Sequence, residues 1–394
     1  MKTSPQEDAP PHSSSPGTAA RALAPDLARG VMLLAIAVAH APLFVVSVDR
    51  GSAAANEITG FLHLLFVHNH ARPMFAFLFG YAMVQLLDRQ TRRGSDWVAI
   101  RKLQRRRGWW LVAIGFVHMA LLVPIDILAV YGMAAVLLAG MLRAKDSALL
   151  WTAGVSLLPA TLTAGLGMWI AMSQGVSTYT QGSIAADERG FVEMFAARLG
   201  GWPFELGIGV ISVVPAVLLG MWAARRRILD EPARNRDLLV RTAVITTVLS
   251  VAGAVPAALI QAGVWARPSA AALWAAALAQ PLTGYLGGIG MAAIIGLVAI
   301  VAVRRRKFLT TAVEALGQRS MSLYLFQSMA FIAVFHPYGL GLQDRLGLAG
   351  AVGVAAVTWL ASLGIAEVMR RAGHRGPAEI LLRRLAYRQQ KRSA

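Results

Sequence analysis

The sequence predicts an all-α membrane protein, a polytopic bundle of about ten transmembrane helices. Of its 394 residues, 56% are hydrophobic and only 15% are charged, whereas soluble domains carry roughly 25% charged residues. Runs of about 20 mostly apolar residues, the length that a bilayer-spanning helix needs, recur along the chain. The 38 basic and 20 acidic residues give a net charge of +18, and most of the basic ones lie in alternate segments between these runs. These observations exclude an ordinary soluble enzyme and a disordered chain.

Ten apolar runs predict the spanning helices. They cover residues 29–48, 72–88, 108–123, 126–142, 148–172, 206–224, 239–262, 281–303, 312–335 and 347–369. The second run is short, and the eighth has no sharp start. Residues 270–280 predict a re-entrant or interfacial piece before Pro281. Residues 186–200, where charges interrupt an apolar pattern, predict an interfacial helix on the outer side.

The distribution of basic residues predicts the orientation. If the N-terminus lies in the cytoplasm, cytoplasmic segments hold 31 lysines and arginines, outer segments hold 6, and Arg319 falls inside a span. Since cytoplasmic loops are enriched in Lys and Arg, both termini are expected in the cytoplasm. The basic clusters then face anionic membrane lipids as partners. No basic–aromatic module accompanies them, so we expect no nucleic-acid partner.

Composition divides the chain into three regions. Residues 1–23 predict a disordered cytoplasmic tail, because they are rich in Pro and Ser. Residues 24–372 predict the transmembrane helix domain, and residues 373–394 predict a cytoplasmic amphipathic tail. The start lacks the basic segment and apolar core of a signal peptide. The absence of cysteine excludes disulfides, thiolate metal sites and a cysteine nucleophile.

The first span carries two ionisable residues on one face. His40 follows Arg29 by eleven residues, a separation that turns a helix by about 1100° and advances it by about 16 Å. Arg29 is then expected near the cytoplasm and His40 near the middle of the bilayer. Ionisable groups at membrane depth are candidates for a functional site. The alternatives are a membrane-surface anchor for Arg29 and a hydrogen bond to a neighbouring helix for His40.

Further polar residues surround the second, third and fourth spans. His63, His68, His70 and Arg72 precede the second span. They predict either an outer polar rim or a group that binds an anion. No third ligand or carboxylate is near in sequence, so we assign no metal. Asp126, in a very short outer turn, predicts either an N-cap of the fourth span or a site residue, and His118 lies eight residues before it.

The ninth span carries a polar stripe. Ser320, Tyr324, Gln327 and Ser328 are spaced so that they share one face of a helix, and Arg319 precedes them. The stripe predicts either interhelical hydrogen bonds or the lining of a polar cavity.

Several segments resemble a known family. They are RGVMLLAIAVAHA, RPMFAFLFGYAMVQLLDRQ, IDILAVYGMAAVLL, ALGQRSMSLYLFQSM and RGPAEILLRRLAY. In this order they resemble the YeiB-like bacterial membrane proteins, catalogued as domain of unknown function 418, over roughly residues 24–390. Gln318-Arg319 followed by Ser-Met-Ser varies the family's usual start to that helix. The resemblance implies a multi-pass protein of the bacterial cytoplasmic (inner) membrane.

This family looks like a distant branch of the transmembrane acyltransferases, which include the acyltransferase-three proteins and the heparan-glucosaminide N-acetyltransferases. The pattern of Arg29, Gly30 and His40 resembles the acyltransferase-three signature. The resemblance implies an enzyme that moves an acyl group from cytoplasmic acyl-CoA, as co-substrate, to an acceptor within or across the membrane. A proton-coupled transporter or a lipid or small-molecule flippase stays open as the alternative, and so does a homodimer.

The acyltransferase hypothesis gives the polar residues roles. Acyl transfer needs a base or nucleophile, a site for the donor's anionic groups and a group that stabilises an oxyanion. The catalytic candidates are His40, Tyr324 and Gln327. The candidates for binding the donor or the acceptor are Arg29, His70, Arg72, Asp126, Arg319 and Ser328.

Overall fold

The structure, a computed structural model, describes residues 23–180, 191–305 and 307–387. These residues form α-helices joined by short turns and 3₁₀ helices, and no β-strand occurs among them. The helices are α1 (Leu23–His40), α2 (Ala53–Phe66), α3 (Ala71–Thr91), α4 (Trp97–Leu121), α5 (Leu128–Leu138), α6 (Asp146–Ser173), α7 (Phe191–Arg225), α8 (Arg236–Gln261), α9 (Ala270–Arg304), α10 (Phe308–Gln318), α11 (Ser320–Phe335), α12 (Leu348–Arg371) and α13 (Pro377–Tyr387).

Six helical segments in the described part of the chain are long and apolar enough to cross a membrane. They are Leu23–Phe44, Asp146–Ser173, Phe195–Arg225, Arg236–Gln261, Ala270–Arg304 and Leu348–Arg371. Their outward faces are apolar too: on α6, Trp151 is 75% exposed and Val155 and Leu158 are each 66% exposed. A soluble protein rarely exposes such a continuous apolar surface. The prediction of an all-α membrane helix bundle is therefore confirmed.

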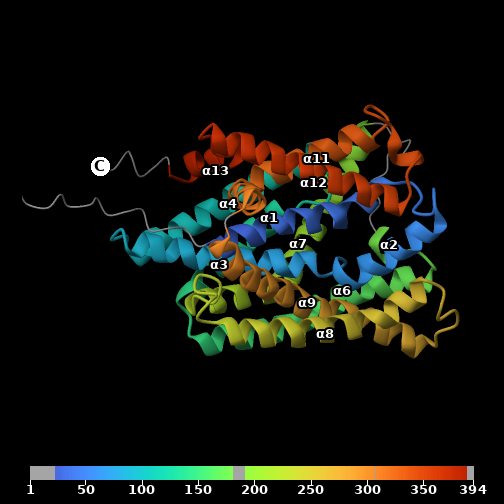
Figure 1. Cartoon of the computed structure of the whole chain (residues 1–394), viewed down its shortest axis with the longest axis horizontal. Helices are drawn as coiled ribbons and strands as arrows, with labels where there is room; N and C mark the ends of the chain where they lie inside the picture. Colours follow the sequence, from blue (N-terminus) through green and yellow to red (C-terminus); the bar gives the residue numbers. More distant parts are fainter. Residues whose placement is uncertain (1–22, 181–190, 306, 388–394) are drawn as a thin grey trace, which may run out of the picture.

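The long helices run side by side, with α13 at one end of the bundle and α2 at the other (Figure 1). Helix α8 packs against α9, α3 against α7, and α4 against α5. Helix α1 lies inside the bundle, in contact with α3, α9, α10 and α12. We call the end with α13 the basic end, because Arg29, Arg89 and Arg107 lie there beside Glu379 of α13 around one cavity. The opposite end, with α2, is the far end.

Two glycines bring α1 and α10 into direct contact. A Cβ atom on Gly30 would clash with the carbonyl oxygen of Val313, and one on Gly317 would clash with the carbonyl oxygen of Asp26. Small residues allow such close approach in membrane helix pairs. This contact fixes α1, and with it Arg29 and His40, against the segment that leads into α11.

The ninth predicted span is wrong in one respect, because residues 312–335 form two helices. Helix α10 ends at Gln318 and α11 begins at Ser320, with Arg319 between them at φ −118° and ψ 24°. The Arg319 guanidinium donates to the carbonyl oxygens of Ala315 and His374. The helix therefore breaks at Arg319, whose side chain binds one carbonyl oxygen near the end of α10 and one in the loop before α13.

Three other segments differ from the prediction. Residues 270–280 are not a separate piece, because α9 starts after Ser269, which caps it by accepting from the Ala272 amide, and runs on through Pro281. Of the interfacial helix expected over 186–200, residues 186–190 lie outside the described residues, and 191–200 form the start of α7. Helix α2 was not predicted, although Ser52 accepts from the Ala55 amide and so caps it.

Candidate functional site

A cavity of about 240 Å³ opens at the basic end. Arg29 comes from α1, Arg89 from α3 and Arg107 from α4, so three helices bring guanidinium groups to one space. Arg29 also donates to Asp26 over 2.9 Å. Guanidinium groups bind phosphate and carboxylate groups through paired hydrogen bonds. The cavity can therefore accept a ligand with several negative charges.

The wall of this cavity becomes aromatic and aliphatic with depth. The ring of Tyr131 lies 5.0 Å from that of Phe75 and 5.2 Å from that of Phe79, and all three residues line the cavity with Leu33 and Ile36. A ligand with a charged head and an apolar extension would fit this gradient.

A second cavity, of about 150 Å³, lies toward the far end. His40, His68, Arg72 and Tyr179 contribute polar groups to it. Burial raises the pKa of the Tyr179 hydroxyl, which therefore stays protonated and able to donate. The two cavities are neighbours, because both are lined by the residues Ile36, Phe75, Ile127 and Tyr131. A third cavity, of about 270 Å³, shares Arg72 with the second and is also lined by Asp126 and Glu205.

A small cavity of about 10 Å³ lies between these spaces. His40, Tyr324, Gln327 and Ser328 line it, as does Ile36. The rings of His40 and Tyr324 are 6.4 Å apart. The polar stripe of α11 thus contacts the end of α1. Three candidate residues of the ninth predicted span, Tyr324, Gln327 and Ser328, therefore lie beside His40.

His118 joins this group, although the sequence did not identify it as a site residue. Its Nε2 lies 2.9 Å from Ser328 Oγ, and its Nδ1 lies 3.0 Å from Asp126 Oδ1. His118 and Asp126 are almost fully buried. Asp126 also accepts the Ala129 amide, in the first turn of α5, through Oδ2, although the N-cap position itself is Ile127. The signal that could have found His118 is its position eight residues before Asp126, across a short turn.

Arg29 and His40 line different cavities that are neighbours. Arg29 lines the cavity at the basic end, and His40 lines the small cavity and the far cavity. Ile36, between them on α1, lines all three. Arg72 lies at the far end, with Nη1 3.4 Å from Ser212 Oγ.

Two candidates lie away from these cavities. His70 points to the α8 side, where Nε2 lies 2.6 Å from Ser250 Oγ, and its Nδ1 lies 2.6 Å from the carbonyl oxygen of His68. Arg319 holds the backbone between α10 and α13, as described above. Both positions give these side chains a structural role rather than a place beside a ligand.

No cluster of three or more His, Cys, Asp or Glu side chains suited to a metal ion occurs among the described residues. The groups that can bind a ligand are the guanidinium groups of the basic end and the uncharged polar groups around His40.

Comparisons with known proteins support the resemblance to domain of unknown function 418. The family model described as "Protein of unknown function (DUF418)" matches residues 223–389. The chain is also similar to the uncharacterized protein YxaH of Bacillus subtilis (strain 168), with 25% identity over 341 residues that cover 82% of this chain and 80% of that protein. The matched region contains α8 to α13, including the stripe of α11. The relationship to acyltransferases stays a prediction.

Proposed function

We propose that the protein is an acyltransferase of a bacterial cytoplasmic membrane, with ten crossings and both termini in the cytoplasm. It moves an acyl group from cytoplasmic acyl-CoA to an acceptor that enters from the far end. The observation that carries the proposal is the succession of three neighbouring cavities from Arg29 to Arg72, with His40 on the space between them. The proposal assigns no metal.

The donor would bind at the basic end. Arg29, Arg89 and Arg107 surround a cavity in which they would pair with the phosphate groups of coenzyme A. The pantetheine arm and the acyl group would extend along the apolar wall formed by Phe75 and Tyr131. The thioester carbonyl would then approach the end of α1.

His40 would act as the general base. Within the part of the chain that the structure describes, no hydrogen bond fixes its imidazole, and it faces two cavities. It would take the proton from the acceptor's hydroxyl or amine as that atom attacks the thioester carbon. The C–S bond breaks, and the proton passes to the thiolate to give free coenzyme A. A positioned base contributes about 10²- to 10⁴-fold to such a rate.

The acceptor would bind in the far cavity. Arg72 supplies a positive charge there, and His68 and Tyr179 supply neutral polar groups. These groups suit an acceptor with hydroxyl groups and one anionic group.

The test uses membranes that contain the protein and labelled acetyl-CoA. His40→Ala should lower the label in the product by about 10²- to 10⁴-fold. The matched control is His374→Ala, since that histidine is exposed in the loop before α13. Equal product from wild type and His40→Ala would remove His40 from the chemistry.

A proton-coupled transporter or flippase is the second candidate, since neighbouring cavities with a histidine between them also suit alternating access. A protonophore separates the two. It should stop a coupled transporter and leave acyl transfer from added acyl-CoA unchanged.

A further inference from the structure

Three side chains from different helices form a chain of contacts beside the small cavity. Ser328 lies on α11, His118 on α4, and Asp126 in the turn before α5. Ser328 Oγ is 2.9 Å from His118 Nε2, and His118 Nδ1 is 3.0 Å from Asp126 Oδ1. The second contact is within ion-pair distance but lacks hydrogen-bond geometry, so that Nδ1 and Oδ1 have no hydrogen-bond partner among the described residues. A hydroxyl, an imidazole and a carboxylate in this order are the arrangement that activates a serine nucleophile.

The carboxylate assigns the roles of the two ring nitrogens. A carboxylate only accepts hydrogen bonds, so the proton of a neutral His118 belongs on Nδ1, beside Asp126. Nε2 then carries the lone pair that faces Ser328 Oγ and can accept the hydroxyl proton. The competing acceptor is the Tyr324 carbonyl oxygen of the same helix, which is farther away, at 3.4 Å from Ser328 Oγ. Asp126 is itself held in place, because its other oxygen accepts the Ala129 amide over 2.5 Å.

Gln327 is the independent observation that points to a ligand. It lines the same cavity as Ser328, it is 2% exposed, and neither its Nε2 nor its Oε1 has a hydrogen-bond partner among the residues that the structure describes. A buried polar group without a partner costs about 1–3 kcal/mol, so native structures seldom keep one without a reason. Because both side chains line this cavity, the unpaired amide N–H can donate to an oxyanion that forms there.

The small cavity that Ser328 lines is adjacent to both larger cavities. The small cavity shares Ile36 and Tyr324 with the cavity at the basic end, and it shares Ile36 and His40 with the far cavity. At about 10 Å³ it holds about one water molecule. An acyl group would enter it by displacing the side chains of Ile36 and Tyr324.

We propose that Ser328 is a covalent acyl carrier, activated by His118 and positioned by Asp126; this deepens the proposed acyl transfer and rests on it for the identity of the donor. Ser328 Oγ attacks the thioester carbon, its proton passes to His118 Nε2, and the C–S bond breaks. His118 returns that proton to the thiolate, which leaves free coenzyme A and an acyl ester on Ser328. The acceptor's O–H or N–H then attacks this ester. His40 takes the acceptor's proton and delivers it to the departing Ser328 Oγ.

The test measures the nucleophile without any acyl-CoA. The purified protein in detergent is treated with diisopropyl fluorophosphate, which forms an O–P bond with an activated serine as fluoride leaves. Mass spectrometry of the peptide from α11 then locates and quantifies the adduct. We expect the adduct on Ser328 in the wild type and none at this position in Ser328→Ala.

Three variants separate activation from folding. His118→Ala should slow labelling of Ser328 by about 10²- to 10⁴-fold. Asp126→Asn should slow it while the melting temperature is retained, because the Asn side-chain oxygen can still accept the Ala129 amide. Asp126→Asn should also leave the affinity for acyl-CoA unchanged. A substitution that disordered the whole site would lower that affinity as well. Ser362→Ala is the matched control: this serine is fully buried, and its hydroxyl donates to the Thr358 carbonyl oxygen of its own helix over 2.8 Å.

The outcomes distinguish this inference from the proposed function. Labelling of Ser328 that depends on His118 supports the nucleophile even if acyl-CoA yields no product, in which case only the proposed donor fails. If wild-type Ser328 stays unlabelled, or if Ser328→Ala makes product at the wild-type rate while His40→Ala does not, the covalent carrier is overturned and direct transfer stands.

Discussion

The contact between α13 and α11 depends on one carboxylate, and Glu379→Gln tests it. Glu379 accepts the Met321 amide over 2.8 Å, the Ser322 amide over 3.3 Å and the Ser322 hydroxyl over 2.5 Å. These amides belong to the first turn of α11, where the N–H groups have no partner within the helix. A negative charge there is also favoured by the helix dipole. Glu379 thus caps α11 from another helix.

The loss can be estimated from those three bonds. Hydrogen bonds to a charged group contribute about 1.5–3 kcal/mol each and neutral ones about 0.5–1.5 kcal/mol. Gln keeps an acceptor and removes the charge. Glu379 is partly exposed, and the three contributions are coupled, so we expect the substitution to reduce the docking free energy of α13 by about 2 kcal/mol. At about 1.4 kcal/mol for each tenfold change, the population of undocked α13 should rise about 30-fold.

Hydrogen–deuterium exchange in detergent measures this population, because amide exchange reports the free energy of local opening. Amides of α13 should exchange about 30-fold faster in Glu379→Gln than in the wild type, while those of α8 stay unchanged. Arg383→Gln is the control, since this side chain is exposed on the same helix. If exchange in α13 is the same in Glu379→Gln and wild type, the carboxylate does not hold the helix and the estimate is refuted.

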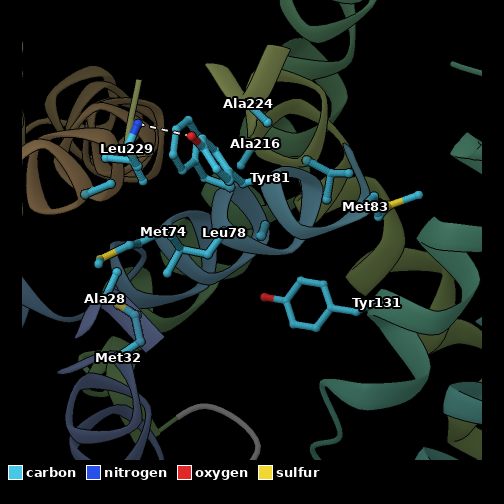
Figure 2. Close-up of a cluster of buried hydrophobic side chains, with 14 of the residues drawn as sticks. Ala28, Met32, Met74, Leu78, Tyr81, Met83, Tyr131, Ala216, Ala224 and Leu229 are labelled. Carbon is cyan, nitrogen blue, oxygen red and sulfur yellow. Dashed lines mark hydrogen bonds between the residues drawn. The ribbon is translucent and has the colours of Figure 1, made fainter. Parts of the chain in front are cut away.

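Three further substitutions test the packing that positions the site. Gly317→Ala should lower the melting temperature in detergent through overpacking of about 1–3 kcal/mol, because the new Cβ would clash with the Asp26 carbonyl oxygen; an unchanged melting temperature would mean that α1 and α10 do not touch there. Tyr81→Phe should lower the free energy of unfolding by about 1–3 kcal/mol, as measured in urea. The reason is that the hydroxyl donates to Asp230 and accepts two backbone amides, one of them drawn in Figure 2. A variant as stable as the wild type would contradict this. Gln280→Leu should speed hydrogen exchange in the turn between α2 and α3, because the Gln280 amide donates to the carbonyl oxygen of Leu64 at the end of α2 and to that of His68 in the turn. Protected amides there would show that other contacts hold the turn.

The helices that the sequence predicted best are those with long apolar runs. The runs at 148–172, 239–262 and 347–369 fall within a few residues of α6, α8 and α12. Length and apolarity are local properties, so they can be read along the chain. The break at Arg319 could not be predicted in this way, because its carbonyl partner at His374 lies 55 residues later.

The candidate site was predicted in part for the same reason. The shared face of Arg29 and His40 and the stripe of α11 are periodic patterns within one helix. The contact between His118 and Ser328 joins residues 210 positions apart, so no local pattern contains it. His70 was predicted as a binding residue from its neighbours in sequence, but the fold turns it toward Ser250 on α8.

The stripe of α11 was open to two interpretations, and the structure divides it between them. Ser328 contacts His118 of another helix, which is the bond that interhelical packing predicts. Gln327, one residue earlier, lines the small cavity with both polar atoms unpaired, which packing alone does not explain. A leucine of similar volume would remove that cost, so stability does not favour glutamine at this position. A ligand with a polarised carbonyl would satisfy the amide. Ser328, His40 and Tyr324, which line the same cavity, are the groups beside it that can act on such a carbonyl. The unpaired amide therefore argues for chemistry at this cavity more directly than either histidine does alone.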